Sequence, residues 1–174
     1  MDLLIGAGSS RVKRLAWPGQ EGWKDLITLD FCSRHNPDVI HDLNEIPLPF
    51  DDDACDSISA YDVLEHVGQQ GDWRFFFDQW AEFWRILRPN GCFFGTSPHY
   101  SSPWAWGDPG HTRVITAESF TILHQPAYEQ VGKTPMTDYR KWYDADFDIL
   151  HTHVNEARQL EFVLRAVKPS RISI

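Results

Sequence analysis

Short apolar runs separated by polar stretches rich in glycine, proline and aspartate occupy the first sixty residues. These runs lie at 2–5, 26–29, 38–41 and 57–60. Each has the length of a buried strand and is bounded by turn-forming residues. The chain therefore begins with four predicted strands.

Residues 73–87 follow a different period. Their large apolar side chains recur three or four positions apart, at Phe76, Trp80, Phe83, Trp84 and Leu87. This spacing predicts an amphipathic helix, with Asp72 placed to cap its N-terminus. Pro89-Asn90-Gly91 is expected to end the helix as a turn, and residues 92–97 to form the fifth strand.

The remaining chain predicts a helix that begins at Thr116 and a hairpin formed by residues 147–154 and 160–167. Strands that alternate with helices and then end in a hairpin predict an α/β fold, a seven-stranded mixed sheet flanked by helices. We expect residues 1–174 to form one domain.

The ends of the first three predicted strands carry candidate ligand-binding groups. The first strand runs into Gly6-Ala7-Gly8, the second ends at Asp30 and the third at Asp42-Leu43. Ligands of parallel sheets bind at the carboxyl ends of strands, glycines allow close backbone approach, and an acid there can bind a ribose. The third glycine of G-x-G-x-x-G is missing, so a cofactor without a pyrophosphate is favoured over a nicotinamide or a flavin.

Taken in order, these motifs resemble the class I S-adenosylmethionine-dependent methyltransferases, in particular the methyltransferase type 11 group. The matching segments are Gly6/Gly8, Asp30, Asp42-Leu43, Pro49-Phe50, Asp56 to Ala60, Leu64-Glu65-His66-Val67 and Arg85–Gly91. The resemblance implies a Rossmann-like sheet of strand order 3-2-1-4-5-7-6 and S-adenosylmethionine as cofactor. Relatives usually have helices before the first strand, which are missing here, and an acid where this chain has Leu4.

The resemblance also implies which residues hold the cofactor. Gly6, Ala7 and Gly8 should lie along its methionine part, with Tyr61 near the sulfonium. The other expected contacts are Asp30 to the ribose, Phe31 beside the adenine, Asp42 to the adenine amino group and the Leu43 amide to a ring nitrogen. The alternatives are plain turn glycines, a strand-end acid in a turn at Asp30 and an Asx-turn at Asp42.

The acceptor side is expected within residues 97–115, which follow the fifth strand. His111 could act as a general base or a donor, with Asp108 fixing its tautomer and His99 as a further candidate. The alternative is that His111 locks its loop to the backbone. The aromatic residues of this segment are expected to seal the core rather than stack on an acceptor: Tyr100, Trp104 and Trp106.

A metal site is a further hypothesis. Asp62, Glu65 and His66, with His99 or His111, resemble a carboxylate–histidine set that some ubiquinone-pathway and small-RNA methyltransferases of this superfamily use for a divalent ion. Asp62 stands where those enzymes have a glutamate. We therefore expect no metal, and expect Glu65 and His66 to frame the pocket.

Composition limits the partners. The net charge of −9 and pI near 5.2 argue against nucleic acid. Arg11, Lys13 and Arg14 are expected to be the solvated face of a short helix.

The three cysteines are scattered and no 18-residue apolar run occurs, which predicts free thiols, no membrane and a cytoplasmic location. Eight tryptophans and a bare first strand favour a homodimer.

The leading functional hypothesis is methyl transfer to an O or N atom of a small-molecule, sugar or nucleotide-linked acceptor. A non-catalytic module that uses the fold for binding or assembly is the alternative, and a nicotinamide enzyme is a third hypothesis that the glycine pattern disfavours.

Overall fold

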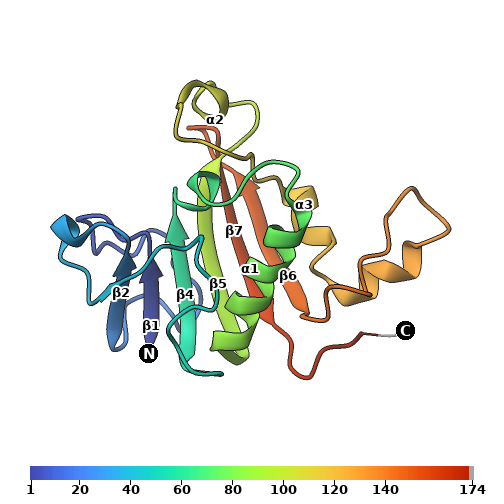
Figure 1. The fold of residues 1–174 in the computed structure, drawn as a ribbon, viewed down its shortest axis with the longest axis horizontal. Helices are drawn as coiled ribbons and strands as arrows, with labels where there is room; N and C mark the ends of the chain where they lie inside the picture. Colours follow the sequence, from blue (N-terminus) through green and yellow to red (C-terminus); the bar gives the residue numbers. More distant parts are fainter. Residues whose placement is uncertain (173–174) are drawn as a thin grey trace.

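A seven-stranded mixed sheet forms the centre of the computed structural model, which describes residues 1–172 (Figure 1). Its strand order is β3-β2-β1-β4-β5-β7-β6, as the resemblance implied. The strands are β1 (Asp2–Ile5), β2 (Leu26–Asp30), β3 (Val39–Ile40), β4 (Cys55–Tyr61), β5 (Leu87–Pro98), β6 (Phe147–Val154) and β7 (Gln159–Ala166).

The first five strands run parallel, so their carboxyl ends share one edge of the sheet. Ile5 of β1 lies opposite both Leu29 of β2 and Ala60 of β4. This register brings the glycine loop, Asp30 and Tyr61 to neighbouring positions at that edge. β7 is antiparallel to both β5 and β6, which completes the sheet.

Helix α1 (Trp73–Ile86) covers one face of the sheet (Figure 1). Trp80 and Phe83 of its predicted apolar stripe are buried, Phe76 and Trp84 are partly buried, and the Trp80 and Phe83 rings lie 5.0 and 4.9 Å from the Phe93 ring of β5. Asp72 caps the helix as expected, accepting from the Phe75 N–H at 3.1 Å.

The other helices are short: α2 (Trp104–Gly107), α3 (Ala117–Thr121) and the 3-10 turns η1 (Ser33–His35), η2 (Leu64–His66) and η3 (Gln125–Gln130). Thr116 opens α3 with a capping box, as predicted. Among the described residues, no helix is long and apolar enough to span a bilayer.

The predicted helix around Arg11, Lys13 and Arg14 is wrong, because residues 9–25 are irregular. The three cations make separate contacts instead. Arg11 donates to the Gly8 carbonyl at 3.0 Å, Lys13 Nζ lies 4.0 Å from Asp2, and Arg14 pairs with Asp62 at 2.6 Å. The segment covers the opposite face of the sheet by packing Leu15 and Trp17 against a small buried cluster of Cys92, Phe94 and Val163.

The expected turn after α1 is also displaced. The helix ends at Ile86 and β5 begins at Leu87, which lies opposite Cys55. The ladder then resumes with Cys92 opposite Ser57, so the four intervening residues bulge out of it. Asn90 has φ of 64°, and this turn chemistry therefore forms an irregularity inside the strand rather than a separate connection.

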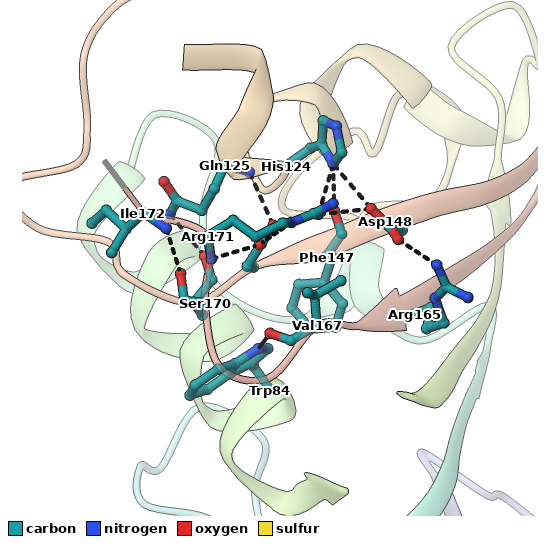
Figure 2. Close-up of polar contacts among 12 residues, drawn as sticks. Trp84, His124, Gln125, Phe147, Asp148, Arg165, Val167, Ser170, Arg171 and Ile172 are labelled. Carbon is teal, nitrogen blue, oxygen red and sulfur yellow. Dashed lines mark hydrogen bonds and ion pairs between the residues drawn. The ribbon is translucent and has the colours of Figure 1, made fainter. Parts of the chain in front are cut away.

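The C-terminal segment returns across the end of α1 and β6 (Figure 2). Trp84 Nε1 donates to the Val167 carbonyl at 3.1 Å, which fixes the chain as it leaves β7. Arg171 then pairs with the fully buried Asp146 and with Asp148, both at 2.7 Å. These contacts hold the end of the chain against the antiparallel part of the sheet.

Candidate functional site

The glycine loop is shaped by close packing at its first glycine. Gly6 has φ of +56°, and a Cβ there would lie 2.1 Å from Val63 Cγ2. Gly8 has φ of +52°, but a Cβ there would meet nothing within 4 Å. Gly6 is therefore required by the fold, whereas the surroundings of Gly8 leave the backbone open to a ligand.

Asp30 holds this loop in place. Its buried carboxylate accepts from the Gly8 and Cys32 N–H groups, both at 2.8 Å, and lies 3.2 Å from His35 Nδ1. Burial opposes its ionisation, but the two backbone hydrogen bonds and His35 outweigh that effect and lower the pKa of Asp30. Asp30 thus orients the glycine loop.

The residues expected around the adenine lie beside this loop. Phe31 is 73% exposed, so its ring is free to contact a base, and Leu43 is buried. Asp42 forms the Asx-turn that was the alternative interpretation, with Oδ1 accepting from Asn44 N and Nδ2 at 2.9 Å. Asn44 in turn accepts from the Gly68 N–H at 2.9 Å, which ties this turn to the segment after β4.

Arg14 occupies the expected position of the sulfonium. Its guanidinium lies 5.3 Å over the Tyr61 ring and pairs with Asp62 at 2.6 Å. The cavity that Gly6, Ala7, Tyr61 and Arg14 help to line is about 100 Å³. Cofactor pockets usually measure about 300–1,000 Å³. The cavity is therefore smaller than a usual cofactor pocket, and Arg14 is the charged side chain that narrows it.

A second set of groups lies after β4. Glu65, His66 and His111 bring one ligand atom each within 4.8 Å of one another, and the two imidazole rings are 4.5 Å apart. Glu65 is 2% exposed, neither carboxylate oxygen has a hydrogen-bond partner among residues 1–172, and burial raises its pKa to about 7. This carboxyl group therefore changes its charge near neutral pH.

His111 is not locked to the backbone through its ring, because its buried Nδ1 has no hydrogen-bond partner in the described part of the chain. Its Nε2 lies 3.8 Å from Asp108 Oδ2, an ion-pair distance that is too long for a hydrogen bond. His66 makes the backbone contact instead, through Nδ1 and the Gly110 carbonyl at 3.0 Å. Within residues 1–172 the His111 ring is thus nearly buried, with no hydrogen bond that fixes it.

Two other expected members lie outside this cluster. Asp62 is engaged by Thr96, Arg14 and Gln159, and His99 by Ser101 at 2.8 Å. The prediction that the aromatic residues of this segment seal the core is wrong. They are 53%, 69% and 70% exposed because α2 stands beyond the carboxyl edge of the sheet (Figure 1): Tyr100, Trp104 and Trp106.

The comparison with known families decides the identity of this arrangement. Residues 3–95, more than half of the chain, match the family model of a methyltransferase domain. The chain belongs to this methyltransferase family. It is a class I, S-adenosylmethionine-dependent member, and its cofactor is S-adenosylmethionine. No curated protein sequence matches it.

Solved structures share the fold of this methyltransferase at low sequence identity. A chain from the complex of the Haloferax volcanii Trm112 methyltransferase activator with a methyltransferase has a TM-score of 0.60 at 15% identity, covering 95% of this chain and 82% of that one. NodS, an N-methyltransferase of Bradyrhizobium japonicum in complex with S-adenosylhomocysteine, has a TM-score of 0.54 at 15% identity, covering 95% of this chain and 76% of that one. An S-adenosylmethionine-dependent methyltransferase of Mesorhizobium loti has a TM-score of 0.54 at 17% identity, covering 94% of this chain and 89% of that one.

Sequence reasoning missed two features of the methyltransferase site. It placed Arg14 on a solvated helix, although an arginine six residues after the glycine loop is close enough in the chain to fold back over it. It also gave Arg113 no role, because nothing in the sequence distinguishes this arginine from the others. Only its burial, to 6% exposure, does so.

Proposed function

We propose that this methyltransferase transfers a methyl group to an O or N atom of a small molecule, with sugars and nucleotide-linked compounds among the candidate acceptors. The observation that carries the proposal is the cluster of the buried Glu65 with His66 and His111. Glu65 and His66 lie in η2, which directly follows Val63, and the Val63 side chain packs against Gly6 of the glycine loop. Proton-accepting groups are thereby placed beside the expected position of the cofactor.

The cofactor supplies an already activated methyl group, so the protein has to hold the acceptor in line and exclude water. Correct positioning alone lowers the barrier by about 7–11 kcal/mol. In this proposal His111 takes the proton from the acceptor as it is methylated, and Asp108 stabilises the imidazolium that forms. The same His111 imidazolium also stabilises the ionised carboxylate of Glu65.

Calorimetric titration with S-adenosylhomocysteine, followed by an acceptor screen that measures its release from S-adenosylmethionine, tests the proposal. We expect micromolar binding with a stoichiometry near one. His111→Ala should then reduce turnover at least tenfold while leaving cofactor binding unchanged, and the exposed His153→Ala should change neither. Absence of binding by folded protein would favour the non-catalytic module.

A divalent metal ion is a second candidate for the chemistry of this cluster. One carboxylate and two imidazoles within 4.8 Å form a donor set that suits such an ion. The ion would acidify an acceptor hydroxyl, which replaces the need for a base. Turnover that falls with EDTA and returns with one added metal would favour this candidate. Unchanged turnover would favour the prediction that no metal binds.

The location and assembly of the protein are further parts of the proposal. A cytoplasmic site of action is supported by the three cysteines, all of which are free thiols. A homodimer is supported by the exposed aromatic rings of α2, Trp104 and Trp106, which could be covered by a second copy. Light scattering coupled to size exclusion would give the mass directly.

A further inference from the structure

A second cavity lies beside the N-terminal end of α1. Its volume is about 210 Å³, and its walls come from three separate parts of the chain. Aromatic side chains and polar groups both line it, including Gln70, Trp73, Phe76, Arg113, Ser119 and Tyr139. An apolar cavity of about 150 Å³ can hold a benzene ring. This cavity therefore has room for one ring with a substituent.

Arg113 gives the cavity its positive charge, while the Asp72 carboxylate, which also lines it, accepts from the Phe75 N–H as the cap of α1. The residue is 6% exposed, and its Nε donates to the Leu64 carbonyl at 2.9 Å while Nη2 donates to Gln79 Oε1. Nη1 has no hydrogen bond within residues 1–172. It is also not one of the fully buried side-chain atoms that lack a partner, so it retains some exposed surface. Within those residues, no carboxylate lies within 4.0 Å of its guanidinium. Nη1 is thus a free donor beside a cavity.

An unpaired buried guanidinium is costly, because burial removes its hydration and no counter-charge replaces it. Burial lowers the pKa of Arg113 to about 10, with Glu65 acting in the opposite direction from beyond ion-pair distance. Arg85 shows the usual arrangement, since it pairs with both Glu82 and Asp52 at 2.8 Å. A ligand that brings an anion to Nη1 would supply the counter-charge that Arg113 lacks.

The cavity shares its wall with the candidate catalytic cluster. The Glu65 carbonyl accepts from the Thr112 N–H at 2.9 Å and the Arg113 N–H at 3.3 Å. Gln70 extends this cross-link, because its N–H donates to the Thr112 carbonyl and its Oε1 accepts from the Val114 N–H, both at 3.0 Å. Residues 65–70 and 111–114 therefore carry both the cluster and Arg113.

We propose that this cavity binds the methyl acceptor, and that the acceptor is a small aromatic molecule bearing an anionic group, either a carboxylate or a phosphate. The anion meets Arg113 Nη1 and the ring lies against Trp73 and Phe76. The proposal rests on the proposed methyltransferase function and narrows its acceptor class. Arg113 is then a residue that determines specificity.

Calorimetry on the full chain with benzoate, phenyl phosphate and neutral benzamide tests this proposal without knowledge of the natural acceptor. We expect at least one anion to bind at least tenfold more tightly than benzamide, and the tighter of the two identifies the anionic group. Arg113→Gln should remove this preference. Arg88→Gln, which removes an exposed arginine of β5 that does not line the cavity, should keep it.

The fluorescence of Trp73 gives a second readout that does not depend on Arg113→Gln being folded. Anion binding should change the emission of the wild-type protein and not that of Trp73→Phe, which keeps a ring in place. Equal binding of benzamide and both anions would overturn the proposal, as would a preference that survives in Arg113→Gln.

Titration of the same samples with S-adenosylhomocysteine separates the two proposals. Cofactor binding without anion preference overturns the acceptor site alone and leaves the methyltransferase function standing. Anion preference without cofactor binding overturns the assignment of the cavity to a methyl acceptor.

Discussion

Asp30 connects the cofactor loop to the cofactor itself. Its carboxylate accepts from the Gly8 N–H, so its removal should both free the loop and remove an acceptor for the ribose. We expect Asp30→Ala to weaken S-adenosylhomocysteine binding by more than about 1 kcal/mol, as loss of charged hydrogen bonds does. Calorimetry measures this, with the exposed Asp51→Ala as control. Unchanged affinity in folded Asp30→Ala would disprove the ribose assignment.

Glu65 makes the stability of the protein depend on pH. Burial raises its pKa to about 7 from the ordinary 4.5, so the folded protein binds the proton more tightly than the unfolded chain. This stabilisation is fully present below about pH 4.5 and is lost as the pH rises through about 7. Each pKa unit corresponds to about 1.4 kcal/mol, so the ionised side chain costs about 3 kcal/mol.

Glu65→Gln removes this ionisation. The variant should therefore be more stable than the wild type by about 3 kcal/mol at pH 8.5, with the difference shrinking towards pH 4.5. Denaturant unfolding at several pH values measures it, and the exposed Glu156→Gln is the control. A stability difference that does not change with pH would contradict the assignment.

At the scale of elements, the irregular segment after β1 controls access to the cofactor cavity. The Arg14 guanidinium lies over Tyr61, where the cationic sulfonium is expected. Arg14→Ala should open the cavity and remove a like charge. We expect it to strengthen binding of S-adenosylmethionine more than that of S-adenosylhomocysteine, which has no sulfonium charge. Equal changes in the two calorimetric affinities would show that only steric access had changed.

The C-terminal segment stabilises the antiparallel part of the sheet. Arg171 makes paired hydrogen bonds to Asp146, whose side chain is 0% exposed. Arg171→Ala leaves this carboxylate buried without its cation, and should lower the free energy of unfolding by about 3 kcal/mol. Arg165→Ala, which removes a half-exposed partner of Asp148, should cost about 1 kcal/mol or less. Thermal or denaturant unfolding compares the two variants.

At the scale of the whole molecule, the cofactor site joins strands that are far apart in the sequence. A ligand that binds the folded form alone stabilises it by about 2.7 kcal/mol at one hundred times its Kd. For a chain of 174 residues this corresponds to a rise in Tm of about 5–11 °C. Differential scanning fluorimetry with S-adenosylhomocysteine should show this rise, and adenosine at the same concentration should give less.

Local periodicity determined the framework of this protein. The strand order and the cofactor followed from the resemblance of the ordered motifs to a known family. The apolar runs, by contrast, predicted the strands, and the spacing of Trp80 and Phe83 predicted α1. These features could be predicted because burial of apolar surface and turn chemistry act over neighbouring residues. The outcome at Asp72 and Thr116 follows the same rule, since a cap depends on the next three residues.

Tertiary structure alone decided the chemistry between these elements. The meeting of Glu65 with His111, the position of Arg14 over Tyr61 and the burial of Arg113 each join segments whose separation carries no local signal. The exposed rings of α2 and the absent helix after β1 depend likewise on which face the packed sheet leaves open. Desolvation and charge pairing depend on these three-dimensional neighbours, so the structure was needed to assign them.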